Sequence, residues 1–323
     1  MKIYMAPALL AFLLMCCQLP TAALSQKEDV TFSNGSVTLA GTLQLPKGRG
    51  PFPAVVFLHG SGPSDRHESK QRAGWFLKKG YAVLTYDKRG VGASQGTEND
   101  WRYYNFDTLA ADAVSALEYL TARSEVNDRM IGLVAASQSG WVVPLVAKKY
   151  PSLSFMIIIS ASVCTVAEDN LFERSRRLKS EGFGLSEIAE VKDMHLIDNQ
   201  LSRTGENYEQ FALLWEQNKD KSWFTRVYLG KQPLAADHPY RLWYRSIMDY
   251  EPQKVLAEID TPILWIYGDA DLDRFAPIAL SLKNIGVLKA SGKPYSIQQY
   301  AGADHNLKGA KYKEAMFQWI LEL

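Results

Sequence analysis

The chain has 323 residues, of which 47% are hydrophobic, and its 36 basic and 35 acidic side chains leave a formal net charge of +1. This length and apolar content suffice for one large domain with an insertion, or for two domains. The near balance of charge indicates no basic face, so we expect neither nucleic acid nor an anionic membrane surface as a partner.

The first 25 residues have the features of an export signal. Lys2 supplies a short positive start, residues 6–15 form an apolar run broken by Pro7, and small residues follow at 22, 23 and 25. The run is shorter than the roughly 20 residues that span a bilayer. We therefore expect a signal peptide over 1–25, an exported mature protein in the periplasm or outside the cell, and no stable membrane span after its removal.

Cysteines leave one alternative open for this segment. Cys16 and Cys17 permit a lipoprotein anchor, although Met15 is bulkier than the small residue that precedes such a cysteine. Once the signal is removed, Cys164 is the only cysteine left, so no internal disulfide is expected. Because Cys164 follows an apolar run, we expect a buried, inert thiol.

The rest of the chain alternates between strand and helix patterns. Strands are predicted at 30–45 (a hairpin turning at Asn34-Gly35), 54–58, 81–86, 130–135, 155–160, 263–267 and 295–300, and helices at 68–79, 107–120, 140–149 and 311–323. Several strands are continuous apolar runs, as in strands buried on both faces. The alternation predicts an α/β fold with a doubly wound, mostly parallel sheet.

The pattern changes between residues 166 and 254, where helical periodicity mixes with charge. We expect a helical cap over the carboxyl ends of the strands, inserted between two core segments at 26–165 and 255–323. The cap is rich in aromatic residues, namely Trp215, Trp223, Tyr228, Tyr240, Trp243 and Tyr244. We expect most of these to pack and one or two to line an apolar substrate pocket.

A candidate nucleophile lies in the sequence I-G-L-V-A-A-S-Q-S-G-W at 131–141. An apolar run ends at Ser137 and a helical pattern starts directly after it, as in the strand-to-helix turn that exposes a nucleophilic serine. Such a turn needs small residues two before and two after the serine, and Ala135 and Ser139 meet this need. Ser139 is the competing nucleophile, but it would place bulky Trp141 in a tight position.

A serine nucleophile needs a base, and His305 is the candidate. It follows the last predicted strand, in a glycine-containing loop at 300–306. In doubly wound hydrolases the chain order is serine, acid, histidine. The alternative for His305 is a solvated loop histidine.

Three carboxylates at 269–273, in a D-x-D-x-D pattern, are candidates for the acid. Asp271 is preferred because the intervening turn after Gly268 can aim it at the histidine, with Asp269 second and Asp273 or plain solvation third. A calcium loop is disfavoured because its sixth position holds Arg274 rather than glycine. We expect no metal and no cofactor.

The oxyanion donors are predicted from the segment H-G-S-G-P at 59–63, directly after a buried strand. Glycines let the backbone approach the reacting carbonyl, and the backbone N–H groups of Ser61 and Gln138 are the expected donors. His59 comes too early in the chain to be the base, so we expect it to fix this loop. Asp87 and Arg89 are expected to hold a second tight turn beneath the site.

The segments quoted above, together with D-K-R-G-V-G at 87–92, resemble the α/β-hydrolase superfamily, most closely bacterial exported hydrolases of the serine aminopeptidase-like and acyl esterase groups. The resemblance runs from about residue 30 to the end. It implies Ser137 as nucleophile, Asp271 as acid, His305 as base and a helical cap. It says little about the substrate, because this fold hosts many reactions.

The sequence therefore predicts a serine hydrolase that cleaves a small or medium acyl ester or thioester through an acyl-enzyme. Two alternatives stay open. One is a peptidase or amidase on the same scaffold, for which Glu168, Asp169 and Glu173 are candidate ligands of a peptide amino terminus. The other is a non-catalytic binding protein. The oligomeric state is not predicted.

Overall fold

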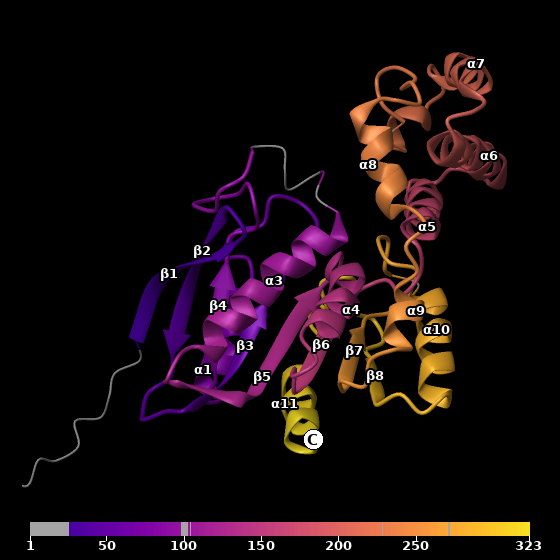
Figure 1. The fold of residues 1–323 in the computed structure, drawn as a ribbon. Helices are drawn as coiled ribbons and strands as arrows, with labels where there is room; N and C mark the ends of the chain where they lie inside the picture. The colour runs from indigo at the N-terminus through magenta and orange to yellow at the C-terminus, as the bar shows by residue number, and fades with distance from the viewer. Residues whose placement is uncertain (1–25, 98–102, 104, 228, 271) are drawn as a thin grey trace, which may run out of the picture.

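A computed structural model describes residues 26–323 apart from 98–102, 104, 228 and 271. The predicted signal peptide lies outside these residues. The described residues form one eight-stranded sheet in the order β1-β2-β4-β3-β5-β6-β7-β8 (Figure 1). The strands are β1 (Gln26–Asn34), β2 (Val37–Leu45), β3 (Phe52–Phe57), β4 (Ala82–Tyr86), β5 (Val126–Ala136), β6 (Phe155–Ile159), β7 (Ile263–Tyr267) and β8 (Tyr295–Gln299).

Strand directions follow the sequence patterns. The Asn34-Gly35 turn joins β1 and β2 antiparallel, and β2 is antiparallel to β4. The remaining neighbours, from β4 to β8, are all parallel. The predicted α/β class with a mostly parallel sheet is confirmed. All parallel strands therefore present their carboxyl ends at one edge of the sheet.

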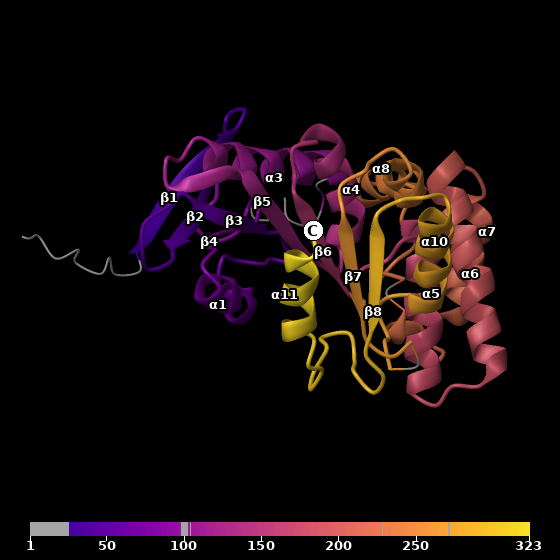
Figure 2. The ribbon, with the colours of Figure 1, turned by 90° about the horizontal axis from the view of Figure 1, so that it is seen from below.

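Helices cover both faces of the sheet (Figure 2). The core helices are α1 (Lys70–Lys78), α3 (Phe106–Thr121), α4 (Ser139–Lys149), α9 (Pro252–Leu256), α10 (Ile278–Ala290) and α11 (Lys313–Leu321). Val55 and Phe57 of β3 share an apolar cluster with α1 and α11. Ala54 and Val56 share another with α3, α4 and α10. Because side chains alternate along a strand, both faces are buried, which explains the continuous apolar runs.

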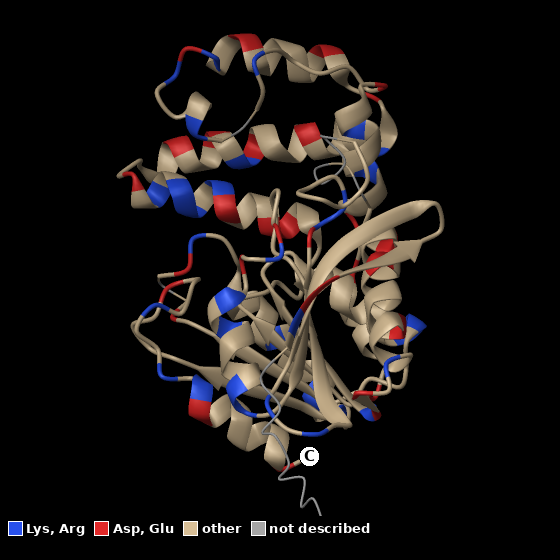
Figure 3. Ribbon diagram, turned by 90° about the vertical axis from the view of Figure 1, so that its left-hand side faces the viewer, with Lys and Arg blue, Asp and Glu red and all other residues tan. Residues whose placement is uncertain are grey.

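The cap consists of α5 (Val166–Ser180), α6 (Leu185–Thr204), α7 (Tyr208–Asn218), the short helix η1 (Phe224–Arg226) and α8 (Pro239–Ile247). These elements lie beyond the carboxyl edge of the sheet, with acidic and basic residues interspersed along them (Figure 3). Helices α5, α6, α7 and η1 enclose an apolar core of their own, which includes Trp215 and Trp223, whereas Tyr244 and Ile247 of α8 pack with the core around the sheet. The first cap helix starts at a capping box made by Thr165 and Glu168. Within the part of the chain that is described, no helix is long and apolar enough to span a bilayer.

Candidate active site

Ser137 lies in the turn between β5 and α4. Its φ angle is +52°, a left-handed conformation that costs a non-glycine residue about 1–3 kcal/mol and is typical of functional sites. The Ser137 N–H donates to the carbonyl of Ile159 at 3.0 Å, and its carbonyl accepts from the N–H of Gly140 at 2.9 Å. A Cβ atom at Gly140 would lie 2.8 Å from that of Ala161, so the turn has no room there. The turn predicted from the sequence is therefore present.

Ser139 does not face the same space. It is buried as the first residue of α4, and its hydroxyl donates to the backbone carbonyl of His59. This bond ties the elbow to the loop after β3. Ser139 thus has a structural contact with this loop.

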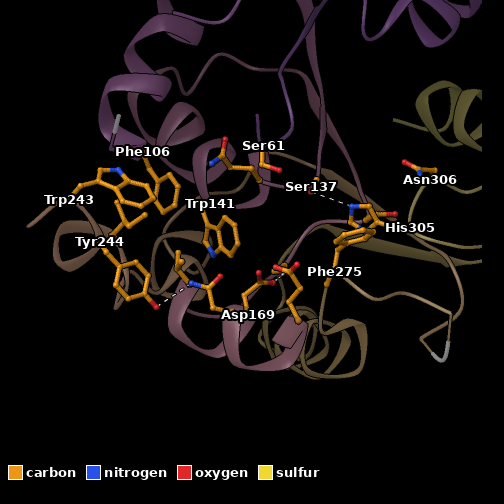
Figure 4. A pocket seen from close by; sticks show the side chains of 18 of the residues that line it. Ser61, Phe106, Ser137, Trp141, Asp169, Trp243, Tyr244, Phe275, His305 and Asn306 are labelled. Carbon is orange, nitrogen blue, oxygen red and sulfur yellow. Dashed lines mark hydrogen bonds between the residues drawn. The ribbon is translucent and has the colours of Figure 1, made fainter. Parts of the chain in front are cut away.

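His305 reaches Ser137 from the loop after β8. Its Nε2 atom is 3.3 Å from Ser137 Oγ (Figure 4). Two contacts with the loop after β7 hold the chain before the histidine. The Asp269 N–H donates to the carbonyl of Ala303 at 2.7 Å, and the Gly302 N–H donates to Asp269 Oδ2 at 3.1 Å. The structure therefore brings together two residues that are 168 positions apart in the chain.

The carboxylate beside His305 belongs to Asp273. Its Oδ2 atom is 2.9 Å from His305 Nδ1, and its Oδ1 atom accepts the N–H groups of Phe275 and Ala276 at 2.8 and 2.9 Å. This contact favours Asp273, the third choice from the sequence, as the acid, while the preferred Asp271 lies outside the described residues. The signal that was missed is the apolar stretch after Asp273, which folds back so that its N–H groups meet a fully buried carboxylate.

The two predicted oxyanion donors flank the nucleophile. Ser61 and Gln138 line the same pocket as Ser137 and His305. The loop with Ser61 lies against the elbow, since a Cβ atom on Gly60 would be 3.7 Å from that of Ser137. Neither the Ser61 N–H nor the Gln138 N–H donates to a described group. Both donors are therefore free for a ligand, and their assignment stays a prediction.

His59 has the structural surroundings expected of it. Its Nε2 atom lies 2.5 Å from the carbonyl of Tyr86, and its ring meets that of Tyr86 edge-on. Burial lowers the pKa of His59 to about 4. The imidazole is therefore neutral at pH 7 and its Nε2–H donates to the carbonyl.

The turn after β4 is held by ion pairs. Asp87 pairs with Arg66 at 2.7 Å and accepts the N–H of Ala93 at 2.9 Å. Arg89 pairs with the buried Asp112 of α3. Both residues were expected to hold this turn, whereas Arg66 was not singled out from the sequence.

A pocket of about 510 Å³ opens in front of Ser137. Its wall includes three of the cap aromatics, Tyr240, Trp243 and Tyr244, which is more than the one or two expected. Figure 4 shows Ser137 and His305 at one end and Trp243 and Tyr244 at the other. Tyr228 lies outside the described residues. The aromatic side chains make this part of the wall suited to apolar acyl groups.

One part of the pocket wall is polar. Asp169, Asn170 and Glu173 of α5 line it, and Ser162 donates a hydrogen bond to Asp169. Burial raises the pKa of Asp169 to about 7. The hydroxyl of Ser160, at the end of β6, is buried in the same wall and has no partner among the described groups. Polar substrate groups can therefore be bound here.

His195 and Cys164 both lie in buried surroundings outside the lining of the pocket. His195 is buried in the cap, where its ring contacts Arg174 and Asn199. Cys164 is buried, and burial raises the pKa of its thiol well above the usual range. Among the described residues, no group of three or more His, Cys, Asp or Glu side chains is gathered to hold a metal ion.

Comparisons with known proteins place this chain in a family. A family model described as serine aminopeptidase, S33, matches residues 50–308. The chain belongs to this family. Esterase EstD of Thermotoga maritima is 45% identical to this family member over 258 residues, which are 76% of this chain and 52% of EstD. A bifunctional esterase/perhydrolase, DCH, of Acinetobacter calcoaceticus is 30% identical over 270 residues, 78% of this chain and 85% of DCH.

Solved structures show the same fold. Esterase Pf2001 of Pyrococcus furiosus superposes on this S33 family member with a TM-score of 0.59 at 16% identity, covering 92% of this chain and 89% of the esterase. DcsB, solved with a substrate analogue, gives a TM-score of 0.60 at 17% identity and coverages of 93% and 99%. The chain spans about half the length of EstD, so what EstD does is a guide to activity rather than a finding about this chain.

Proposed function

We propose that this protein is a serine hydrolase that cleaves carboxylic esters. The observation that carries the proposal is the continuous contact from Asp273 through His305 to Ser137, with gaps of 2.9 and 3.3 Å. A serine hydroxyl becomes nucleophilic when a neighbouring base accepts its proton and a carboxylate orients that base. The esterase relatives support the same reaction class.

The reaction follows from the positions of these groups. His305 Nε2 takes the hydroxyl proton as Ser137 Oγ attacks the ester carbonyl. The N–H groups of Ser61 and Gln138 stabilise the oxyanion. The protonated imidazole then gives its proton to the leaving alcohol, and an acyl-enzyme remains. Water, deprotonated by His305, attacks the acyl group and releases the acid.

The pocket indicates which esters fit. Its volume suits small or medium acyl groups, and the aromatic end favours apolar chains. The acidic lining side chains are Glu173 and Asp169, whose pKa of about 7 leaves it partly charged at neutral pH, while the described lining contains no lysine or arginine. A strongly anionic leaving group such as coenzyme A would meet these carboxylates. Mouse acyl-coenzyme A thioesterase 1 is a relative at 23% identity over 204 residues, but the charge of the pocket favours uncharged oxygen esters.

The test is a panel of fluorogenic esters with acyl chains from acetyl to dodecanoyl, compared with acyl-coenzyme A thioesters of the same chains. We expect turnover of the oxygen esters with an optimum at short or medium chains, and kcat/KM at least about tenfold lower for the thioesters. Absence of turnover for every ester, by a folded protein, would reject the proposal and favour a non-catalytic binding protein.

A second candidate activity is hydrolysis of amides or peptides with a free amino group. Asp169 and Glu173, named above as candidate ligands of an amino terminus, line the pocket, whereas Glu168 belongs to the capping box of α5. The unpartnered hydroxyl of Ser160 adds a polar group to the same wall. Aminoacyl anilides test this alternative. If it holds, the double variant Asp169→Asn/Glu173→Gln should lose activity on aminoacyl anilides while keeping its activity on butyryl ester.

We also propose that residues 1–25 direct export of the protein to the periplasm or the medium. The support is the pattern of Lys2, the apolar run and the small residues after it. The intact mass of the protein recovered from each cell fraction tests this. Recovery of the whole chain, with residues 1–25 retained, from the cytoplasmic fraction would overturn it, whereas a lipid on Cys16 or Cys17 would show that the exported protein is anchored.

A further inference from the structure

A buried lysine lies behind the oxyanion loop, in the turn after β4. Lys88 is 2% exposed. Its neighbours Asp87 and Arg89 each have an ion-pair partner, but no described carboxylate lies within ion-pair distance of Lys88 Nζ. Glu68 acts on it only at longer range. Burying an ammonium group without a counter-charge is costly, so its position needs an explanation.

All three hydrogen bonds of the Lys88 side chain go to the oxyanion segments. Nζ donates to the carbonyls of Gly60 at 3.1 Å and Gly62 at 3.4 Å, and to Gln138 Oε1 at 2.8 Å. An ammonium group has three N–H donors, and each has an acceptor here. Two of these acceptors flank Ser61, and the third belongs to Gln138. One cation therefore connects both halves of the predicted oxyanion site.

The contact with Gly60 has a direct consequence for the Ser61 N–H. In a trans peptide the C=O and N–H bonds point in opposite directions. An ammonium group bound to the Gly60 carbonyl therefore fixes the direction of the N–H on the other side of the same peptide unit. It also polarises that unit, which makes the N–H a stronger donor. Gly62, at φ +94°, adopts a conformation open chiefly to glycine and has no side chain to hold this loop, so the contacts of Lys88 supply that support.

We propose that Lys88 is a positioning residue of the oxyanion site: its ammonium group holds the Gly60–Ser61 peptide and the Gln138 side chain so that both backbone N–H groups converge on the oxygen of the reacting carbonyl. The proposal rests on the ester-hydrolase function proposed above. Lys88 touches neither the substrate nor Ser137 in this scheme. Its effect appears when the carbonyl oxygen becomes negative, which is the step that the two N–H groups stabilise.

The test compares Lys88→Met, which keeps the length of the side chain but removes the ammonium group, with the wild-type protein on a butyryl ester. Titration with a fluorophosphonate first gives the fraction of active sites in each preparation. We expect kcat per active site to fall by about 10- to 100-fold. This fall should not exceed the fall in kcat that removal of one direct oxyanion donor causes. KM should change by less than about threefold, because the ground-state ester makes little use of the donors.

Inhibition by a boronic acid separates a role in the oxyanion site from a role in stability alone, because a loss of stability would leave the Ki unchanged. The tetrahedral adduct of the boronic acid with Ser137 places an oxygen in the oxyanion site, so the Ki should rise by about the same factor as kcat/KM falls. Lys88→Arg, which keeps a cation and its N–H donors, should recover part of both losses. If Lys88→Met is not folded by circular dichroism, Lys88→Arg and Lys88→Gln are compared in the same way.

Arg66→Met is the matched control. Arg66 is a cation of the same region, with bonds to Asp87 and to the Gly41 carbonyl, but none to residues 60–62 or 138. Asp87 keeps the N–H of Ala93 as a donor after the substitution, so this variant should fold. We expect a lower thermal midpoint with an unchanged boronate Ki. Equal rises in Ki for both variants, or a wild-type kcat and Ki in Lys88→Met, would overturn the proposal. A folded wild-type protein without esterase activity would instead refute the function on which it rests.

Discussion

Asp273 holds the imidazole of His305 from the side opposite Ser137. Its Oδ2 atom is 2.9 Å from His305 Nδ1, and the carboxyl group is fully buried. Two backbone N–H groups, from Phe275 and Ala276, donate to Oδ1 of the same carboxyl group and hold it in place. With a proton on Nδ1 shared with Asp273, Nε2 is left as the acceptor that faces Ser137 Oγ.

Replacement of this carboxylate gives the first prediction. Asp273→Asn should lower kcat by about 10⁴-fold, because an amide in this position favours the wrong tautomer of the histidine. Asp269→Asn should cost less than about tenfold, since its side-chain oxygen can still accept the N–H of Gly302. Steady-state kinetics on a butyryl ester measure both. Asp271→Asn is the second control, and a larger loss there than in Asp273→Asn would restore the assignment made from the sequence.

The approach of the β7 and β8 loops gives a second prediction. A Cβ atom on Gly268 would lie 2.4 Å from the Ala303 carbonyl and 2.6 Å from that of Asp304, and this backbone leads directly to His305. Gly268→Ala should therefore displace the histidine, lower kcat by at least about tenfold and reduce the thermal midpoint. Gly286→Ala in α10 is the control, because nothing lies within 4 Å of its added methyl group. We expect that variant to be as active and at least as stable as the wild type. A fully active Gly268→Ala protein would contradict the prediction that the close approach of Gly268 to the Ala303 and Asp304 carbonyls positions His305.

The layers of the fold were predictable because they follow from local patterns. Continuous apolar runs identified the central strands, and the Asn34-Gly35 pair identified the hairpin. The proximity of the candidate nucleophile Ser137 to the candidate base His305 was also predictable, since a strand-to-helix turn and the order of residues along the chain are properties of the sequence. The choice among Asp269, Asp271 and Asp273 was not. It depends on how a turn folds back on itself, which spacing alone does not determine.

The role of the D-K-R-G turn was only partly predictable for the same reason. Asp87 and Arg89 are charged residues at a turn, for which a structural role is the usual expectation. Lys88, between them, is also a charged residue at a turn, but its ammonium group is buried instead of paired with a carboxylate. Its burial against Gly60 and Gln138 results from the packing of three separate segments. No periodicity or spacing in the sequence predicts such a contact.

The buried His59 gives a prediction about stability and pH. Its pKa is lowered from 6.5 to about 4 in the folded protein, because burial disfavours the charged imidazole. Between these values the unfolded chain binds more protons than the folded one, so the unfolding free energy falls as the pH falls. From about pH 7 to about pH 4.5 this group alone should remove about 2 kcal/mol.

Urea denaturation of the wild type and His59→Gln at the two pH values isolates this effect. The advantage of the wild type over the variant should shrink by that amount at the lower pH. Asp169, with its raised pKa, contributes a change of opposite sign, but it is present in both proteins and cancels. His67→Gln, at an exposed site, is the control for the substitution of a histidine by glutamine. An advantage of His59 that stays constant with pH would contradict the neutral, buried assignment.

The most direct test of the whole account is the position of covalent labelling by a fluorophosphonate, measured by intact mass and peptide mapping. We predict a single adduct on Ser137 in the wild type. Ser137→Ala should give no adduct, and Ser139→Ala should be labelled at close to the wild-type rate, because Ser139 only donates to the His59 carbonyl. Labelling of a folded Ser137→Ala protein at the wild-type rate would contradict the central claim that Ser137 is the nucleophile.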